Sequence, residues 1–233
     1  MPLWTRRHRW DGRLFPVLAL VGLLLLLTPY LLTNLVASVR GLTVWDPKTA
    51  FRFSDGTFLD HAIPFVDWSI LVYSTNVLFY LALPLAAPRT DGGRRELLVV
   101  IQSIVLASWV AFAIFLVSPA HVDLRWQVIE AGGTRGVLGL LYSSIHWMDL
   151  PYNSWPSLHV TQTFLVAMGL TRWWTDRGLK LRVLLVWVLW GGIVLSTLTT
   201  KQHFLWDVVT GLALGLVAWW FGPRNVCGDS LDG

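Results

Sequence analysis

Cysteine is nearly absent from this sequence: Cys227 is the single cysteine among 233 residues. One cysteine cannot form an internal disulfide, so a fold held together by disulfides within the chain is excluded. Charged residues are also few, at 14% of the chain, whereas 55% of the residues are hydrophobic. With a mean hydropathy of +0.57, this composition excludes an ordinary soluble domain and is typical of a membrane protein with several spans.

Acidic residues are outnumbered, 14 against 18 Lys and Arg, which gives a net charge of +4. The basic residues lie in short stretches between apolar runs, where membrane orientation explains them. We therefore expect no nucleic-acid partner. The 15 tryptophans also favour a bilayer, because the indole ring concentrates where apolar surface meets a wet interface.

No small-x-small cleavage site closes the first apolar run, which follows four arginines between positions 6 and 13. The run is too long for a typical signal peptide, so we interpret it as a retained first helix. We expect an all-α polytopic membrane protein with six transmembrane helices in one bundle, forming one domain over residues 1–233. The predicted spans cover about 14–38, 64–86, 97–117, 158–174, 181–198 and 203–221, each long enough to cross the hydrocarbon.

The longest stretch outside the predicted spans is 118–157, which mixes charged and apolar residues. This mixture predicts a partly interfacial loop with a short amphipathic helix, and a loop of this length is usually functional. Twelve Lys and Arg lie on the side of the N-terminus and six on the other side. The positive-inside rule therefore places both termini in the cytoplasm and the loop outside. The arginine-rich, lysine-poor composition is typical of a bacterium with a high-GC genome, so we expect the membrane to be a bacterial plasma membrane.

Two polar residues between the last two predicted spans, His203 and Asp207, are four positions apart. In a helix beginning at about His203, their side chains would share one face. An acid beside an imidazole fixes the tautomer of the ring and favours its charged form, which suits a nucleophilic or acid–base histidine. Taken alone, such a pair is more often a helix cap and an anchor at the lipid boundary.

A second polar stretch, Pro156-Ser157-Leu158-His159, precedes the fourth predicted span. Ser157 is a good N-cap residue, and the N–H groups and dipole at a helix start favour an anion there. His159 would lie in the first turn, on the same outer side as His203. Polar groups at membrane depth are expensive and usually face an internal cavity. Two histidines, one acid and one helix N-terminus therefore predict a site that binds an anion.

The stretches Pro156–His159 and Ser196–Asp207 resemble the second and third signatures, P-S-G-H and S-R-x5-H-x3-D, of the type 2 phosphatidic acid phosphatase superfamily. Six helices, with motifs before the fourth and between the fifth and sixth, are similar to its membrane branch. Leu158 stands for the glycine and Thr197 for the arginine, which is similar to the inositol phosphorylceramide synthase-like branch. The first signature, K-x6-R-P, is not found, and Arg125 is the best substitute for its phosphate-binding cation.

This resemblance implies phosphoryl transfer on a lipid phosphate in the bilayer, at a site on the extracytoplasmic face. His203 would attack phosphorus and form a phosphohistidine, Asp207 would hold its ring, and His159 would protonate the leaving oxygen and then deprotonate water or an alcohol. No metal or other cofactor is implied. The phosphate oxygens would be bound by Ser157, Arg125 and Lys201.

Three alternatives stay open. The first is a lipid headgroup phosphotransferase, and the second is a zinc site formed by His159, His203 and Asp207. The third is a non-catalytic membrane protein or transporter with a degenerate site. The motifs specify neither the lipid nor an oligomeric state. No role is expected for the other polar residues of the outer loop, His121, His146 and Asp149.

Overall fold

The computed structural model describes residues 14–227, and these residues form helices and loops without a β-strand. The all-α prediction is therefore confirmed for this part of the chain. The arginines at positions 6 to 13 and the last residues of the C-terminal tail lie outside the described residues. Their contribution to membrane orientation stays a prediction, as does the single-domain assignment.

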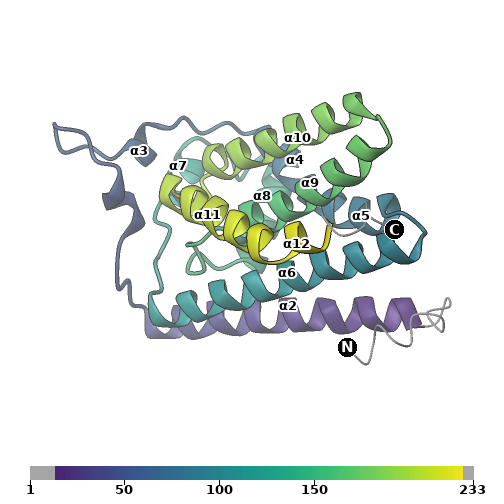
Figure 1. Cartoon of the computed structure of the whole chain (residues 1–233). Helices are drawn as coiled ribbons and strands as arrows, with labels where there is room; N and C mark the ends of the chain where they lie inside the picture. Colours follow the sequence, from purple (N-terminus) through teal and green to yellow (C-terminus); the bar gives the residue numbers. More distant parts are fainter. Residues whose placement is uncertain (1–13, 228–233) are drawn as a thin grey trace.

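Each predicted span corresponds to helical structure (Figure 1). The second is divided at Thr75 into α4 and α5, and the others are single helices. These elements are α2 (Leu14–Arg40), α4 (Ser69–Ser74), α5 (Asn76–Ala86), α6 (Asp91–Val117), α9 (Leu158–Asp176), α10 (Lys180–Thr199) and α11 (Leu205–Phe221).

Three helix starts differ from the prediction by two residues or more. Helix α4 begins at Ser69 instead of about residue 64. Helix α6 begins at Asp91 instead of about residue 97, because the Thr90 hydroxyl accepts a hydrogen bond from the backbone N–H of Gly93 (3.1 Å) and caps the helix. Helix α11 begins at Leu205 instead of 203. His203 therefore lies before the helix and not within its first turn.

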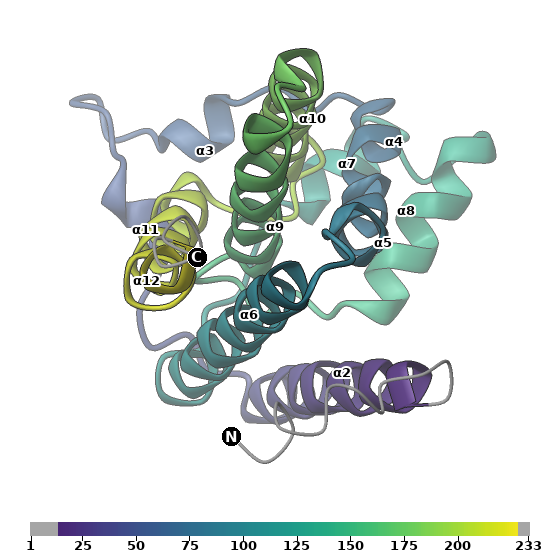
Figure 2. The same cartoon turned by 45° about the vertical axis from the view of Figure 1, so that its right-hand side comes forward.

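Within residues 14–227, five short helices lie outside the predicted spans. The short helix expected within 118–157 is confirmed, and a second one precedes it. Helix α8 lies at the periphery beside α4 (Figure 2), and it exposes Val137, Leu140 and Trp147, as expected of an interfacial segment. The short helices are η2 (Pro47–Ala50), α3 (Leu59–Ala62), α7 (Arg125–Glu130), α8 (Gly136–Met148) and α12 (Pro223–Cys227).

Among the described residues, five stretches are long and apolar enough to cross a membrane. Helix α9 is not one of them, because polar residues such as Thr161, Gln162 and Thr163 interrupt its apolar sequence. These three side chains are buried against neighbouring helices. The six-span count therefore stays a prediction that depends on α9. The five stretches are Leu20–Arg40, Ser69–Ala86, Asp91–Val117, Lys180–Thr199 and Leu205–Asn225.

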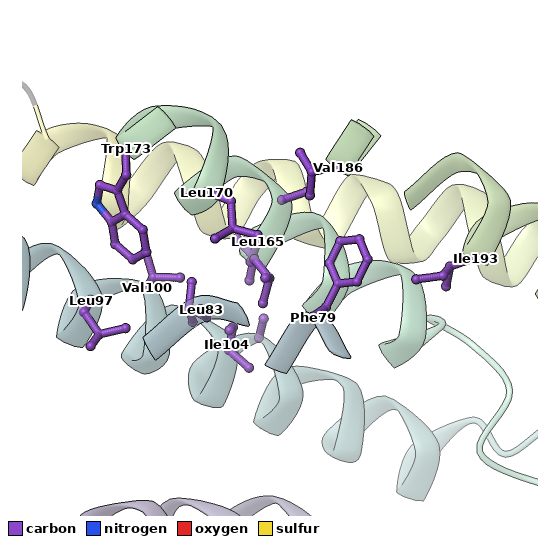
Figure 3. Close-up of a cluster of buried hydrophobic side chains, with 13 residues drawn as sticks. Phe79, Leu83, Leu97, Val100, Ile104, Leu165, Leu170, Trp173, Val186 and Ile193 are labelled. Atoms are coloured by element: carbon purple, nitrogen blue, oxygen red, sulfur yellow. The ribbon is translucent and has the colours of Figure 1, made fainter. Parts of the chain in front are cut away.

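Helix α9 occupies the middle of the molecule and packs against α5, α6, α10 and α11, while α2 packs against α6 (Figures 1 and 2). The main apolar cluster fills the space between α9 and its neighbours (Figure 3). Trp173 extends this cluster, and its indole N–H donates to the buried carboxylate of Glu96 (2.6 Å). The cluster contains Phe79, Leu83, Leu97, Val100, Ile104, Ala107, Leu165, Val166, Ala167, Leu170, Trp173, Val186 and Ile193.

Candidate active site

Two glycines allow α11 to pack closely on the first half of α9. A Cβ atom at Gly211 would lie 2.6 Å from the backbone oxygen of Ser157, and one at Gly215 would lie 2.9 Å from a ring carbon of Phe164. Backbone and hydroxyl hydrogen bonds join the helices here, from Ser157 N to Asp207 O (3.0 Å) and from Thr161 Oγ1 to Gly211 O (2.8 Å). This close packing places the first turn of α9 beside the start of α11.

Asp207 is completely buried at the start of α11. Its Oδ2 accepts the backbone N–H of Phe204 (2.9 Å) and lies 3.2 Å from Nδ1 of His203. The predicted contact between His203 and Asp207 is therefore present. Its origin differs from the prediction, since His203 precedes the helix and is held by its own N–H, which donates to the carbonyl of Thr197 (3.2 Å).

His159 joins the two sequence motifs. Its Nδ1 lies 3.2 Å from Nε2 of His203, and its Nε2 lies 2.8 Å from the hydroxyl of Tyr73. One set of tautomers satisfies every contact: Tyr73 donates to His159, His159 donates to His203, and His203 donates to Asp207. In this arrangement Nε2 of His203 keeps the lone pair that a nucleophile needs.

Tyr73 was not among the residues expected from the sequence. It lies in α4, within the second apolar stretch, and its side chain is only 5% exposed. A single tyrosine in an apolar run has no local signal that separates it from an interfacial anchor. Its hydroxyl can donate to a neutral imidazole or accept from a protonated one, so it can hold His159 in both protonation states.

We expect Tyr73→Phe to lower turnover about fivefold, because one hydrogen bond to His159 is worth roughly 1 kcal/mol. The pH–rate profile should also change, since the substitution removes a hydrogen-bond partner of the proposed acid and base His159. Tyr80→Phe is the matched control, because Tyr80 donates to Gln162 farther along α9. Equal effects of the two substitutions on rate and pH profile would contradict a specific role of Tyr73.

Arg125 begins α7 and reaches the turn that carries His203. Its Nη2 donates to the carbonyl of Asp149 (2.7 Å) and lies 3.4 Å from Oε1 of Gln202. Its Nε is buried and has no hydrogen-bond partner among the described residues. Burial lowers the pKa of Arg125, while the nearby Asp149 carboxylate opposes this shift. Arg125 therefore has an unused N–H donor close to the turn that carries His203.

His146 also borders this turn, although no role was expected for it. Its Nε2 lies 3.1 Å from Nε2 of Gln202, an amide donor, so this ring nitrogen acts as an acceptor. Burial, together with the charge of Arg125, lowers the pKa of His146 to about 4. The ring is therefore neutral at physiological pH.

The segment that follows α8 docks on the middle of α2. Asn153 Nδ2 donates to the carbonyl of Tyr30 (2.9 Å) and to the hydroxyl of Thr33 (3.0 Å), and Asn34 Nδ2 donates to the carbonyl of Leu150 (2.8 Å). Tyr30 lies ten residues before the end of α2, which is roughly 15 Å along a helix axis. The segment that leads to α9 is therefore anchored to α2 about three turns before that helix ends, and α2 lies next to this part of the site.

Two of the residues expected to bind phosphate contact the protein itself. The Ser157 hydroxyl accepts the N–H of Val160 (3.4 Å), which confirms its predicted role as N-cap of α9. The Lys201 ammonium donates to the carbonyls of Asp60 (3.1 Å) and Ile63, and burial lowers its pKa to about 8. Contact of Ser157 or Lys201 with phosphate stays a prediction.

Asp60 was also missed from the sequence. Its buried carboxylate accepts the N–H of Leu205 (2.6 Å) and so caps α11 from a distant loop. The interaction joins positions 145 residues apart, so no local pattern indicates it. Together with Lys201, Asp60 fixes the turn that carries His203.

A metal centre has no support in the geometry of the described residues. Among residues 14–227, no group of three or more His, Cys, Asp and Glu side chains is arranged to hold a metal ion. His159 and His203 instead face each other at hydrogen-bond distance.

A family model described as the PAP2 superfamily matches residues 97–226, which is more than half of the 233-residue chain. The chain belongs to the PAP2 superfamily. PAP2 membership indicates phosphatase or phosphotransferase activity on a phosphate-containing substrate. The PAP2 match covers His159, His203, Asp207 and Arg125, whereas Tyr73 lies outside it. No curated protein and no solved structure matches the chain, and the assignment to the inositol phosphorylceramide synthase-like branch stays a prediction.

Proposed function

We propose that this protein is an integral membrane phosphatase that releases phosphate from a lipid through a phosphohistidine intermediate. The observation that carries this proposal is the continuous series of contacts from Tyr73 through His159 and His203 to Asp207. A nucleophile in contact with a base or acid, which a third group orients, is the general arrangement for covalent catalysis.

In the first half-reaction, Nε2 of His203 attacks phosphorus and the bond from phosphorus to the lipid oxygen breaks. The bound phosphate would replace the hydrogen bond between the two imidazoles. His159, protonated as the anionic substrate binds, gives the Nδ1 proton to the leaving oxygen. The buried carboxylate of Asp207 holds the His203 ring and stabilises the cation that forms.

Phosphate oxygens have two sources of unused donors near His203. The first is Arg125, whose buried Nε lacks a partner among the described residues. The second is the start of α9, where no described residue accepts the backbone N–H groups of Leu158 and His159. Ser157 and Lys201 complete the predicted phosphate-binding set. Both side chains now contact the protein itself, so they would contact phosphate only after substrate binds.

We place this site on the extracytoplasmic face of a bacterial plasma membrane, with both termini inside. The placement rests on the excess of Lys and Arg on the side of the N-terminus and on α9 as a sixth span within one bundle. Helix α9 has 19 residues, 12 of them buried, so neighbouring helices instead of lipid surround its polar side chains.

The test is phosphate release by the purified protein in detergent, on a panel of lipid phosphate monoesters, lipid diphosphates and phosphodiesters, with EDTA present. Release of free phosphate in EDTA, inhibited by vanadate, is the expected result. Loss of activity in EDTA would instead favour metal catalysis. A flat response across the panel, with no transfer product, would favour a transporter or a degenerate site.

A lipid headgroup phosphotransferase is the second candidate. Leu158 and Thr197, which stand where the phosphatase signatures have glycine and arginine, favour it. A phosphotransferase would use the same phosphohistidine but would pass the phosphoryl group to a lipid or polyol hydroxyl. It is distinguished by a new phosphorylated product that forms only when the second alcohol is added.

We expect Arg125→Lys to raise the KM for the phosphorylated substrate by about 10–100-fold, with a smaller change in kcat. A charge-assisted hydrogen bond contributes about 1.5–3 kcal/mol, and a lysine cannot reproduce the guanidinium fork. Arg135→Lys is the matched control, since Arg135 is an exposed residue of the same loop. An unchanged KM in Arg125→Lys would argue against phosphate binding by Arg125.

A further inference from the structure

Asp149 lies between α2 and the turn that carries His203. Its Oδ1 accepts hydrogen bonds from the Tyr30 hydroxyl and from Asn34 Nδ2 (3.0 Å), both on α2. Its backbone carbonyl accepts from Nη2 of Arg125 (2.7 Å), and the same nitrogen lies 3.4 Å from Gln202, the residue before His203. The carboxylate is therefore fixed at the wall of the proposed active site.

Asp149 is only half-buried. Two donors converge on Oδ1, whereas Oδ2 has no hydrogen-bond partner among the described residues. One carboxylate oxygen thus stays available close to the turn that carries His203.

A carboxylate is an unusual neighbour for a phosphate site, because both groups are anionic and both only accept hydrogen bonds. A ligand with an O–H group can lie between them. Water has two such groups, so it can donate one to His159 Nδ1 and the other to Asp149 Oδ2. An alcohol has one O–H at the attacking oxygen, so it cannot donate to His159 and to Asp149 Oδ2 at the same time.

We propose that Asp149 positions the water that hydrolyses the phosphohistidine, and that it thereby selects water over alcohols as the second nucleophile. The inference rests on the function proposed above. In this step the water oxygen bonds to phosphorus, and the bond from phosphorus to Nε2 of His203 breaks. One proton of the water moves to His159 Nδ1. The other stays on the product phosphate, where Asp149 accepts its hydrogen bond.

The Asp149→Asn substitution distinguishes two roles of this residue, binding of the attacking water and anchorage of α2. The amide oxygen can still accept from Tyr30 and Asn34, while an NH₂ group replaces the free acceptor Oδ2. A position that only anchors α2 should change both half-reactions alike. A position that binds the attacking water should change only the second.

The experiment labels wild type and Asp149→Asn with a ³²P-phosphorylated lipid that the wild type turns over, traps the phosphoenzyme in alkali, and follows its decay with and without methanol. We expect formation of the Asp149→Asn phosphoenzyme to stay within about threefold of wild type and its hydrolysis to fall about 10²-fold. The ratio of methyl phosphate to inorganic phosphate should then rise at least about tenfold. Asp55→Asn, which removes an exposed loop carboxylate, should behave as wild type.

Equal slowing of formation and decay, or an unchanged product ratio, would overturn the inference and leave the phosphohistidine standing. The wild type supplies a second measurement that needs no substitution. Transfer to methanol in proportion to its mole fraction would show that the site does not select water, and would overturn the inference as well. A wild type that is neither labelled nor active would remove the proposed function, and this inference with it.

Discussion

Replacement of His203 by alanine is expected to lower phosphate release by about 10⁴–10⁶-fold, because the substitution removes the covalent path itself. Formation of ³²P-phosphoenzyme should disappear with it. His203 is only 4% exposed, and its side chain contacts Asp207 and His159, both polar. Removing it should therefore lower the thermal midpoint far less than it lowers activity.

The matched control is His121→Ala, which removes an exposed loop histidine that packs on Tyr152 with ring centroids 5.0 Å apart. It should keep wild-type turnover and labelling. A His203→Ala protein that folds and keeps more than about a hundredth of the wild-type rate would show that the nucleophile lies elsewhere. The His159→Ala substitution should lower the rate of phosphate release by about 10²–10⁴-fold, which is the range that general acid–base catalysis contributes.

Replacement of Gly211 by alanine is expected to destabilise the protein and to abolish activity, although Gly211 contacts no substrate. The new Cβ would lie 2.6 Å from the Ser157 carbonyl oxygen, 3.2 Å from the Ser157 nitrogen and 3.2 Å from Val160 Cβ. The nearest of these atoms belong to backbone and cannot rotate away. Overpacking of this kind costs about 1–3 kcal/mol, and relief by separation of α9 from α11 would also separate His159 from His203.

Gly191→Ala is the matched control, because a Cβ atom there would meet nothing within 4 Å. It replaces glycine by a better helix former within α10, so its thermal midpoint should be equal to or above that of wild type. The readouts are the thermal midpoint in detergent and phosphate release. A Gly211→Ala protein with wild-type stability and rate would contradict the close approach of α9 and α11.

The sequence was sufficient to identify the two histidines proposed to be catalytic, because each stands in a local motif beside a helix start. Ser157 caps α9 as its residue type predicts, and a four-residue spacing places Asp207 beside His203. The physical cause of the contact between Asp207 and His203 nevertheless differed from the predicted one. Asp207 reaches His203 because its side chain caps the turn at Phe204, and not because both residues share a helix face.

Local sequence patterns did not predict the other polar residues around the site. Tyr73, Asp60 and Asp149 are polar residues in an apolar helix or in loops, and each gains its contact from a segment at least 86 residues away in the chain. The helix α9 itself was predicted, but its threonines and glutamine lower its apolar character, so hydropathy alone does not identify it as a membrane span. Burial within the protein offsets that polarity, and a linear sequence does not show burial.

The docking of residues 149–153 on α2 has a consequence for biosynthesis. The chain leaves the ribosome from the N-terminus, so α2 is synthesised more than a hundred residues before its partners Asn153 and Leu150. Until they arrive, the side-chain amide of Asn34 needs other hydrogen-bond partners, because hydrocarbon supplies none. Helix α2 is therefore in place before the segment that docks on it, and the site should form only after α11, which follows His203, has been inserted.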